Sequence, residues 1–469
     1  MASPSPRRRP GHGSFRPIAS VEVELSRPIP DLVPEPVGRY GAALVLVRVH
    51  GRPIGFAHVP LPDGGLGAAD LAATLWFRLC DEVTSHLVAD GLPAPLGLDR
   101  YGLPTGVDPA CVVDRVRRIG DPPLASVIIA TRDRPASLAC CLASLGQLAY
   151  PRTEIVVVDN CPTTDETAEL VDRWTGTGQR IRYVREPRPG LAVAHNRGVQ
   201  EARGDVLAFT DDDVLVDRWW LDELVAGFGA ADGVGCVTGL ITAAELETPA
   251  QVWAERHWGL GKGFTRTVVD LHDQRPPGRL FPYAAGTLGS GANMAFSAAA
   301  LWSIGGFDAV LGTGTRAMGG DDLAAFYRTV VNGHGLVYEP AAIVRHSGHQ
   351  GAAALRRQAY GYGVGLTAYL TSIVAHDPTT LARVLPRIPA AVGHAVSPRR
   401  PAPSPFVSPP GARPAPGVVA RRWLGMACGP MAYARSRRWA RRLDAFERMP
   451  SVSNASAATE DEACPPFPG

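Results

Sequence analysis

Short apolar runs recur along the middle of the chain, each followed by a polar loop and then by a segment with helical periodicity. Runs of this length and composition are typical of buried strands. Strands that alternate with helices at this spacing predict a doubly wound α/β domain with a mostly parallel sheet. Ligands of such sheets bind outside the carboxyl ends of the strands, so the polar residues after each run are the candidates for a site. The expected strands lie at residues 126–130, 154–158, 181–184 and 206–210.

The first part of the chain has a different pattern. Apolar runs at residues 43–47 and 54–59 flank a turn at 50–53, which predicts a hairpin. A helical repeat of apolar residues follows over 68–89. We therefore expect a small α+β domain over residues 21–120, in which no catalytic constellation is visible and whose role stays open.

The α/β domain is expected over residues 121–385. The last part of the chain, after residue 385, is expected to lie outside this domain. Residues 386–417 are rich in Pro and Ala and predict a linker. Residues 418–448 predict a basic amphipathic helix, which suits an anionic membrane surface and simple packing equally well. The polar ends of the chain, 1–20 and 449–469, are expected to be disordered.

Composition narrows the function only a little. At 469 residues and 45% apolar, the chain can hold two or three domains, and its net charge of +2 gives no reason to expect a nucleic-acid partner. The eight cysteines form no CxxC pair and no histidine cluster accompanies them, so neither a zinc site nor a disulfide framework is expected. No secretion signal and no apolar window of about 18 residues is visible. These observations predict a cytoplasmic protein, at the inner face of the cell membrane if the basic helix binds there.

The strongest chemical signal is the triplet Asp211, Asp212 and Asp213, which ends the apolar run at 206–210. Three adjacent carboxylates repel one another, and a folded protein usually offsets this with a cation or hydrogen-bond donors. Oxygen ligands suit Mg²⁺ or Mn²⁺, which often share such a site with substrate phosphates. The triplet therefore predicts a metal-assisted enzyme acting on a phosphorylated or nucleotide-linked substrate. A solvated acidic turn is the alternative, and the downstream motifs disfavour it.

Polar residues after the earlier strands are candidates for nucleotide binding. Thr131 and Arg132 open a loop that runs to Arg134 and offers backbone donors and guanidinium groups to a nucleotide. Asp159 ends the next strand, where it can accept a hydrogen bond from a base or ribose, although a lone Asp there is more often a helix cap. A glycine opens the helix that contains Asn196 and Arg197, and a glycine-led helix start can approach a phosphate closely.

Small and acidic residues farther along predict the reaction centre. Gly291 and Asn293 belong to a segment of small residues that lets a ligand approach the backbone. Gly320 precedes Asp321 and Asp322, which begin a helix. The simplest interpretation of the two carboxylates is that they cap the start of this helix. The glycines before them favour a loop that passes close to a substrate. A general base needs a carboxylate within reach of the attacking hydroxyl, and Asp322 is the candidate, with Asp321 orienting or contacting the acceptor.

Two further groups complete the expected site. His346 follows a strand-like run and is a candidate for the metal shell or for a diphosphate contact. An acceptor pocket is expected over residues 240–290, where Trp253, Trp258 and Tyr283 either stack on sugar rings or pack in the core.

Taken together, these motifs resemble family 2 glycosyltransferases of the GT-A fold. The resemblance covers residues 126–349, about half of the chain, and is specific because of the order and spacing of its pieces. The matching segments read SVIIATRDRP, IVVVDN, EPRPGLAVAHNRGV, GDVLAFTDDDV, GSGANMAF, GGFD, GGDD and VRHSG.

The resemblance implies an inverting transfer from a nucleotide-diphosphate sugar, with Mg²⁺ or Mn²⁺ as the cofactor. Asp211 and Asp213 would form the DxD element, and Asp322 of the acidic pair would be the base. The QxxRW signature of processive synthases is absent, so transfer of a single sugar is expected, to a sugar, a lipid-linked or a small-molecule acceptor. Cell-envelope, exopolysaccharide, glycolipid or natural-product glycosylation would be the setting. The nucleoside pocket would be lined by Thr131, Arg132, Asp159 and Asn160.

Other classes of protein carry some of the same sequence motifs. Haloacid-dehalogenase-like phosphatases also carry a strand followed by DxD, a later acidic pair and a lysine, here Lys262, but they use their first strand for it. A sugar-nucleotide pyrophosphorylase would need a glycine-rich loop after the first strand, which TRDRP is not. A catalytically silent nucleotide-sugar-binding protein is the third alternative, and the complete acidic set argues against it.

Overall fold

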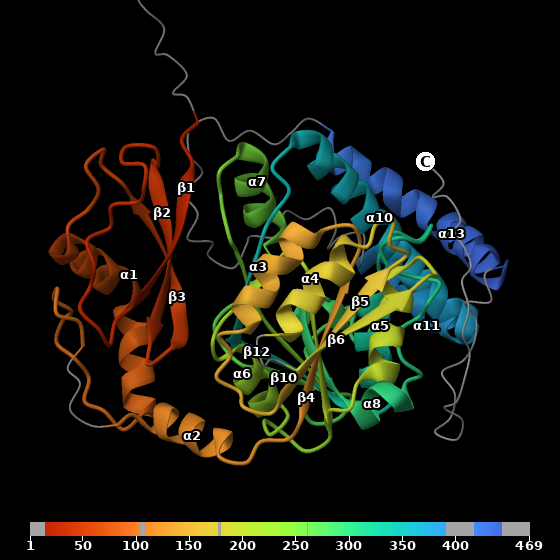
Figure 1. The fold of residues 1–469 in the computed structure, drawn as a ribbon, viewed down its shortest axis with the longest axis horizontal. Coiled ribbons are helices and arrows are strands. Elements are labelled where there is room, and N and C mark those ends of the chain that lie inside the picture. Colours follow the sequence, from red (N-terminus) through yellow and green to blue (C-terminus); the bar gives the residue numbers. More distant parts are fainter. Residues whose placement is uncertain (1–14, 104–107, 177–179, 260, 391–416, 443–469) are drawn as a thin grey trace, which may run out of the picture.

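The computed structural model describes two lobes, which a helical segment joins along one side (Figure 1). The smaller lobe is formed by the N-terminal part of the chain, and the larger lobe contains the main sheet. The expected disordered tail at 449–469, most of the linker at 386–417 and the end of the predicted helix after 442 lie outside the described residues. The structure describes residues 15–103, 108–176, 180–259, 261–390 and 417–442.

The N-terminal lobe is a sheet of three strands backed by one long helix. Strand β1 (Ile18–Glu24) runs parallel to β2 (Ala42–Val49), and β2 forms an antiparallel hairpin with β3 (Arg52–Pro60). Helix α1 (Ala68–Ala89) packs its apolar residues against the sheet. The predicted hairpin and helix are therefore present, and β1 begins within the N-terminal segment that was expected to be disordered.

Helix α2 (Ala110–Ile119) joins the lobes. Its buried Arg115 pairs with Glu223 of the larger lobe at 3.0 Å, and Arg118 pairs with Asp222 at 2.8 Å. Because Glu223 is fully buried, its charge depends on these arginines. The pairs fix α2 against the larger lobe.

The larger lobe is built on a mixed sheet with helices on both faces. Strands β4, β5, β6, β7, β9 and β12 run in one direction, and β8, β10 and β11 run against them, so the predicted mostly parallel α/β sheet is confirmed. The strand order is β10-β12-β9-β11-β7-β4-β5-β6, and β8 pairs with β12. The strands are β4 (Ala125–Thr131), β5 (Thr153–Asn160), β6 (Ile181–Glu186), β7 (Val206–Asp211), β8 (Val214–Val216), β9 (Val234–Ala243), β10 (Thr267–Val269), β11 (Asn293–Ser297) and β12 (Gly335–His346).

Apolar residues of α3, α4 and α6 cover one face of this sheet, and those of α5, α8 and α9 cover the other. Several of the helices begin where the sequence provides a start signal, as at Pro135 in the first turn of α3 and at the capping box of Thr248 and Gln251 before α7. The helices are α3 (Pro135–Leu145), α4 (Glu166–Thr175), α5 (Leu191–Glu201), α6 (Trp220–Gly227), α7 (Pro249–Trp258), α8 (Ala298–Ser303), α9 (Asp321–Val331), α10 (Ala352–His376), α11 (Thr380–Val384) and α13 (Val418–Arg442), with short 3₁₀ turns at Ala285–Leu288 and Leu385–Arg387.

Strand β12 contains a bulge beside β9. Glu339 pairs with Gly239 and Ile343 pairs with Leu240, so three residues of β12 bulge out between consecutive partners on β9. The buried Asn293 amide donates to the carbonyl oxygens of Leu240 at 3.0 Å and Ala342 at 2.9 Å. The amide therefore ties the bulge to the neighbouring strand and satisfies backbone oxygens that the ladder leaves unpaired.

Helices α10 and α13 lie side by side along the edge of the larger lobe (Figure 1). Glycines make the close approach possible, because a Cβ at Gly363 or Gly425 would collide with the backbone of the facing helix. Tyr433, Ser436 and Ala440 of α13 are buried. Of the two expectations for the basic helix, the described residues show packing. None of the described helices is long and apolar enough to cross a bilayer.

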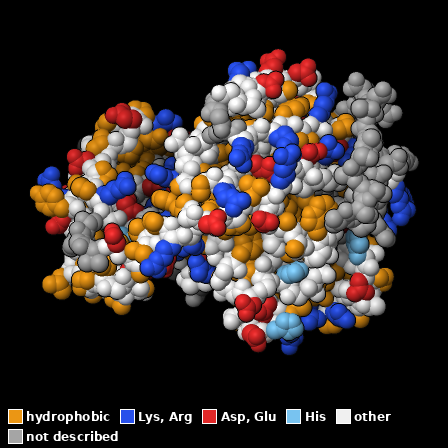
Figure 2. Space-filling view, turned by 60° about the horizontal axis from the view of Figure 1, so that its bottom comes forward, with side chains coloured by type: hydrophobic (Ala, Val, Ile, Leu, Met, Phe, Trp, Pro, Cys, Tyr) orange, Lys and Arg blue, Asp and Glu red, His pale blue; other side chains and the backbone are white. Residues whose placement is uncertain are grey.

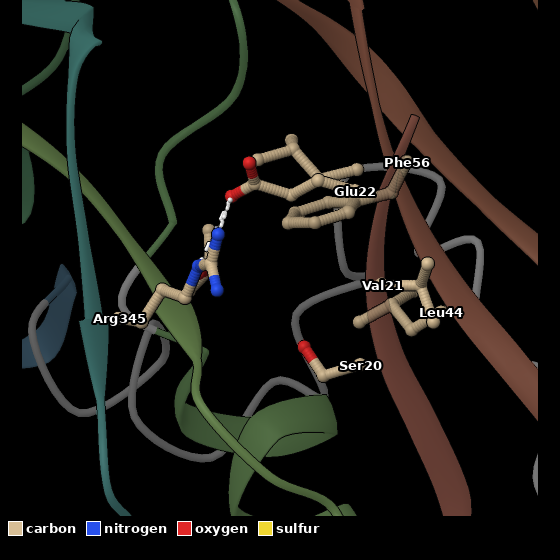
Figure 3. Close-up of a pocket in the computed structure, with 8 residues that line it drawn as sticks. Ser20, Val21, Glu22, Leu44, Phe56 and Arg345 are labelled. Atoms are coloured by element: carbon tan, nitrogen blue, oxygen red, sulfur yellow. Dashed lines mark hydrogen bonds and ion pairs between the residues drawn. The ribbon is translucent and has the colours of Figure 1, made fainter. Parts of the chain in front are cut away.

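The two lobes also meet at a small pocket between the N-terminal sheet and the end of β12 (Figure 3). Arg345 reaches across to Glu22 at 2.8 Å, and Arg48 of β2 pairs with Glu22 at 3.1 Å and with Asp217 at 2.6 Å. The charges on both sides of the pocket therefore form one connected set of ion pairs.

Candidate functional site

The acidic triplet lies at the carboxyl edge of the sheet, as predicted. Strands β7, β4 and β5 are neighbours, and their register places Asp211 opposite Ala130 and Thr131 opposite Asp159. Residues that end three different strands therefore meet at one edge. Short strand β8 follows the triplet at once and pairs with the end of β12, with His346 opposite Val214. This pairing brings His346 beside Asp213.

Three of the predicted metal ligands come together at this edge. One ligand atom each from Asp211, Asp213 and His346 lie within 4.8 Å of one another. His346 Nε2 is 3.4 Å from Asp213 Oδ1, and that buried oxygen has no hydrogen-bond partner among the described residues. Two carboxylates and one imidazole, with a buried oxygen unsatisfied, fit a divalent cation such as Mn²⁺ that keeps positions open for substrate oxygens.

Asp212 faces away from that group. Its side chain is 4% exposed, and its oxygens accept a hydrogen bond from Thr131 Oγ1 at 2.7 Å and pair with Arg134 at 2.6 Å. Arg134 also reaches Asp213 Oδ2 at 2.9 Å. Asp212 therefore anchors the loop after β4 and has little surface for a nucleotide sugar. Arg134 belongs to the polar loop whose guanidinium groups were predicted to meet a nucleotide, and in this structure it pairs with the triplet.

Burial and mutual repulsion make it unfavourable for all three carboxylates of the triplet to be ionised, and a bound cation would offset this. Burial, together with the charges of Asp213 and Asp212, raises the pKa of Asp211 to about 8. Burial raises the pKa of Asp212 to about 6, against the hydrogen bond from Thr131. Without a bound cation, Asp211 therefore holds a proton at neutral pH, and a metal ion must displace it.

The expected nucleoside side of the site contains one unsatisfied carboxylate. Asp159 is fully buried and accepts a hydrogen bond from Tyr183 at 3.0 Å, while its Oδ1 has no hydrogen-bond partner within the described part of the chain. Burial raises its pKa to about 6, against that hydrogen bond. Arg132 lies on the same edge, 3.6 Å from Asp133. Asp159 and Arg132 therefore lie at the same sheet edge as the triplet, and their contact with a nucleoside stays a prediction.

Asn160 has a structural task. Its Oδ1 accepts from Gly190 N at 2.9 Å and its Nδ2 donates to Arg188 O at 2.7 Å. Gly190 has a φ of 133°, a conformation that favours glycine, and it begins α5. Asn160 therefore shapes the loop before α5, and its amide reaches a nucleoside only if these bonds are exchanged.

The acidic pair begins α9 and faces the triplet. Asp322 Oδ2 accepts from Gly291 N at 3.0 Å and its Oδ1 accepts from Leu323 N at 2.8 Å. Gly320, with a φ of 89°, precedes the helix, and a Cβ there would meet Gly365 O of α10 at 2.6 Å. Gly320 and Gly291 therefore position the carboxylate of Asp322 and need not touch a ligand themselves.

Burial changes the acidity of this pair. It raises the pKa of Asp322, against hydrogen bonds from backbone amides, and with the charge of Asp322 it raises the pKa of Asp321 to about 7. A carboxylate with a raised pKa is a better proton acceptor than a solvated one. Asp321 is 5% exposed, and the less buried Asp322 is the better placed of the two to meet an acceptor.

Three of the predicted contacts are structural in this fold. Asn196 exchanges hydrogen bonds with both the nitrogen and the oxygen of Phe307 at 2.9 Å, and Arg197 pairs with Glu201 one turn along α5. Asn293 is fully buried beneath the sheet edge, where its Oδ1 accepts from Trp220. The prediction that Asn293 lines the pocket is wrong, because all its amide atoms are engaged in the core.

Helix α10 adds residues that the sequence did not indicate. Tyr362 is 44% exposed, and burial of its hydroxyl together with the charge of Asp322 raises its pKa to about 12. Gln358 donates to that hydroxyl at 3.1 Å, and the ring of Trp258 lies 5.4 Å from the ring of Tyr362. Of the expected aromatic residues, Trp258 therefore borders the acidic site. Trp253 is buried, and Tyr283 stacks on Tyr327.

The face drawn in Figure 2 carries side chains of both charges among its described residues. On the face shown in Figure 2, acidic and basic side chains are interspersed over both lobes. This agrees with the small net charge of the chain.

Comparison with known proteins gives a family match over the residues that hold the triplet. Residues 126–304 match the model described as "Glycosyl transferase family 2". The match covers strands β4 to β11, and it favours a transferase over the dehalogenase-like phosphatase. Together with the sheet, it confirms the predicted GT-A type α/β fold.

The relatives are similar over short segments. An uncharacterised protein of Sinorhizobium fredii is 37% identical over 118 residues, which are 24% of this chain and 13% of that protein. The O-antigen biosynthesis protein RfbC of Myxococcus xanthus is 32% identical over 25% of this chain and 9% of its own length. The pre-mycofactocin glycosyltransferase of Mycobacterium tuberculosis is 26% identical over 47% of this chain and 42% of its own length. The chain thus spans less than half the length of these relatives.

A solved structure of the mannosyltransferase PcManGT from Pyrobaculum calidifontis, in complex with GDP-Man and Mn²⁺, aligns with a TM-score of 0.40 and 18% identity. The alignment covers 72% of this chain and 82% of that chain.

Proposed function

We propose that this chain, which carries a family 2 glycosyltransferase domain at residues 126–304, moves one sugar from a nucleotide-diphosphate sugar to an acceptor hydroxyl with inversion. The observation that carries the proposal is the pairing of two acidic groups at one sheet edge. Asp211, Asp213 and His346 form a set of metal ligands, and Asp322 lies near enough to raise the pKa of Asp211 by its charge.

The residues at the sheet edge have different roles in binding the donor. Asp211, Asp213 and His346 would hold a divalent ion, Mg²⁺ or Mn²⁺, and such an ion would offset the negative charge of the leaving diphosphate. Asp159 accepts a hydrogen bond from the base or ribose through its unsatisfied oxygen. Arg132 and the loop after β4 lie at the same edge of the sheet. Arg134 holds Asp212 and Asp213 in place, so the carboxylates keep their direction when the donor enters.

Asp322 acts as the base from the other side of the site. Its carboxylate is fixed by amide donors from Gly291 and Leu323, and burial raises its pKa. It takes the proton of the acceptor hydroxyl while that oxygen attacks the anomeric carbon opposite the departing phosphate, which inverts the configuration. Tyr362 and Trp258 border the approach of the acceptor, and an aromatic face suits a sugar ring.

The biological setting belongs to the same proposal. Relatives with similar segments include a protein named for O-antigen biosynthesis and a pre-mycofactocin glycosyltransferase. These names support glycosylation of an envelope polysaccharide, a glycolipid or a small natural product. The acceptor would be a sugar, a lipid-linked or a small-molecule alcohol.

Calorimetric titration of the full chain with UDP, GDP and dTDP, each with and without Mn²⁺, tests the proposal. We expect one nucleotide to bind, and to bind tightly only with the metal. The exposed Asp232→Asn variant controls for general loss of charge and should bind like the unchanged protein. Metal-dependent binding with no transfer to any alcohol would indicate a silent binding protein. Failure of all three nucleotides to bind would overturn the donor assignment.

A further inference from the structure

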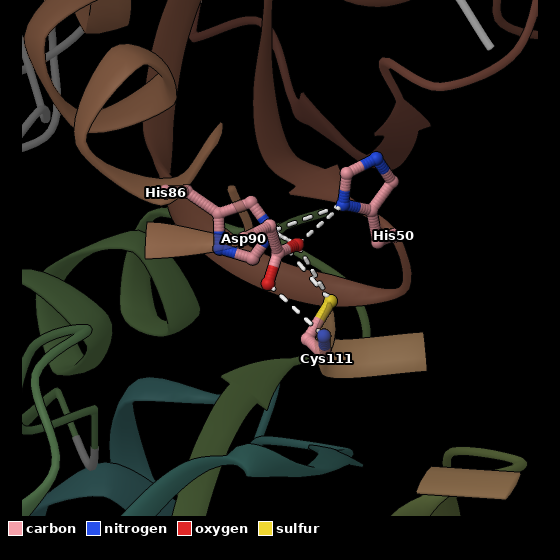
Figure 4. Close-up of side chains that lie close together, drawn as sticks. All are labelled: His50, His86, Asp90 and Cys111. Carbon is pink, nitrogen blue, oxygen red and sulfur yellow. Dashed lines mark hydrogen bonds and ion pairs between the residues drawn. The ribbon is translucent and has the colours of Figure 1, made fainter. Parts of the chain in front are cut away.

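Four metal-ligating side chains converge in the N-terminal lobe, far along the sequence from the acidic triplet. His50 lies in the turn between β2 and β3, His86 and Asp90 lie at the end of α1, and Cys111 lies in the first turn of α2. Figure 4 shows the four side chains pointing toward one another from these three elements. One ligand atom from each lies within 4.8 Å of all the others.

The contacts in this cluster centre on one carboxylate oxygen. Asp90 Oδ2 lies 2.8 Å from His50 Nδ1, 3.2 Å from His86 Nε2 and 2.8 Å from Cys111 Sγ. The two imidazole nitrogens are 3.3 Å apart, and His86 Nε2 is 3.9 Å from Cys111 Sγ. The other oxygen, Asp90 Oδ1, accepts from the backbone nitrogen of Cys111 at 3.0 Å, which fixes the orientation of the carboxylate.

These separations are close to those of a tetrahedral metal site. Zinc bonds of about 2.0–2.1 Å to nitrogen and about 2.3 Å to sulfur put neighbouring ligand atoms about 3.3–3.6 Å apart. The nitrogen–nitrogen distance already matches, and the nitrogen–sulfur distance exceeds this range only slightly. The two contacts of 2.8 Å are hydrogen bonds to Asp90 and would lengthen when a metal replaces the shared protons.

The backbone holds the ligands before any metal arrives. His50 has a φ of 54° and Gly51 a φ of 79°, which together form the tight hairpin turn. The Glu24 carboxylate accepts from the nitrogens of both residues, at 3.0 and 2.8 Å. His86 and Asp90 are four residues apart and so share one face of α1. The side chains of His50, His86 and Asp90 are 8%, 13% and 6% exposed, so the cluster is shielded from solvent.

We propose that His50, His86, Asp90 and Cys111 bind a transition-metal ion of the Zn²⁺ type that has a structural role. A thiolate and two imidazoles favour a borderline-soft ion over Mg²⁺ or Mn²⁺, and four protein ligands leave no position for a substrate. The ion would join the hairpin turn, α1 and α2. Because Arg115 of α2 pairs with Glu223 of the larger lobe, the same ion would steady the junction between the lobes.

Cobalt substitution tests this proposal on the full chain, with any affinity tag removed. The chelator-treated protein is titrated with Co²⁺ under reducing conditions, and absorption in the near ultraviolet reports a thiolate bound to cobalt. We expect one equivalent of Co²⁺ to give this band in the unchanged protein. The band should be lost in Cys111→Ser and kept in Cys140→Ser, which changes an exposed free cysteine of α3.

Zinc competition gives a second measurement that does not depend on the cysteine variant. Zn²⁺ should displace Co²⁺ and remove the band, and His86→Gln should weaken Zn²⁺ binding by more than the 10- to 100-fold that is typical for loss of an outer partner. Chelation should lower the melting temperature of the unchanged protein. A protein that gives no thiolate band with Co²⁺, or a band that survives Cys111→Ser, would overturn the proposal. Neither result bears on nucleotide binding at the acidic triplet.

Discussion

The two clusters of metal-ligating residues differ in position and in ligand chemistry. The set of Asp211, Asp213 and His346 lies at an open sheet edge, is rich in oxygen and faces a second pair of carboxylates. The set in the N-terminal lobe joins a turn and two helices and contains a thiol and two imidazoles. An exchangeable hard cation suits the first set, and a permanently held softer cation suits the second.

The two sites differ in how many coordination positions of the metal the protein itself would fill. Three ligands from the sheet edge leave coordination positions that a donor diphosphate can fill. Four ligands in a shielded cluster leave none. If this is correct, changes at the sheet edge act on turnover, and changes in the N-terminal lobe act on stability.

The largest effect should come from Asp322→Asn. The amide keeps the size of the side chain but cannot accept the acceptor's proton, so transfer should fall by about 10²–10⁴-fold. Donor binding measured by calorimetry should stay nearly unchanged. Cys111→Ser is the matched test in the other cluster and should lower the melting temperature while keeping turnover within a few fold. Full turnover by Asp322→Asn would remove Asp322 as the base and weaken the comparison.

Asp213→Ala should separate the two metals in one protein. The change removes an oxygen ligand and the partner of His346, so Mn²⁺-dependent nucleotide binding should weaken by at least about tenfold. The thiolate band of the cobalt-loaded protein should not change, because Asp213 is not part of the cluster of four side chains that contains Cys111. Unchanged metal dependence would count against the assignment of the triplet, and loss of the thiolate band would show that the clusters are not independent.

The pH dependence should be opposite for metal binding and for stability. Asp211 has a pKa of about 8 in the folded protein, so Mn²⁺ affinity should rise as pH rises through about 8. The pKa is about 4 in the unfolded chain, so the metal-free protein should lose stability as pH rises from about 4 to about 8. Asp211→Asn should flatten this loss and stabilise the metal-free protein at neutral pH by on the order of 2 kcal/mol, since one pKa unit is about 1.4 kcal/mol and neighbours share the shift. Chemical denaturation at several pH values measures it, and equal slopes in both proteins would refute it.

The smallest effect is expected from Arg345→Ala at the junction between the lobes. The ion pair with Glu22 is partly exposed, with side-chain exposures of 45% and 24%, so its loss should cost about 1 kcal/mol or less. Arg345→Lys should recover part of the loss. Denaturation measures the change, and a loss of nucleotide binding in Arg345→Ala would show that the lobes are coupled more tightly than the ion pair indicates.

The sequence predicts the α/β fold well because β4, β5 and β7 are mostly buried and apolar and are regularly spaced. It also predicts that Asp211, Asp213 and His346 lie together, since carboxyl ends of parallel strands share one edge, and their role as metal ligands stays a prediction. It fails for Asn293, because a buried amide that holds a bulge looks the same in sequence as a polar group facing a ligand. The pairing of Arg134 with Asp212 and Asp213 was not predicted, and Tyr362 was missed, because both depend on contacts between distant segments.

The cluster of the N-terminal lobe shows the same limit. The expectation of no zinc site rested on the absence of close cysteine and histidine spacing. Its four ligands are spread between His50 and Cys111, which are 61 positions apart in the sequence, and only the packing of the turn against two helices brings them together.

The bulge in β12 determines which side of the sheet each of the following residues of that strand faces. Successive residues of a strand face opposite sides, so Arg345 turns toward the N-terminal lobe and His346 toward Asp213. Adding or removing one residue at the bulge would interchange these directions and break the lobe contact and the metal shell at once. Asn293 donates a hydrogen bond to the bulge and so helps to fix which side of the sheet each later residue of β12 faces. Insertions in the bulge should therefore be tolerated poorly.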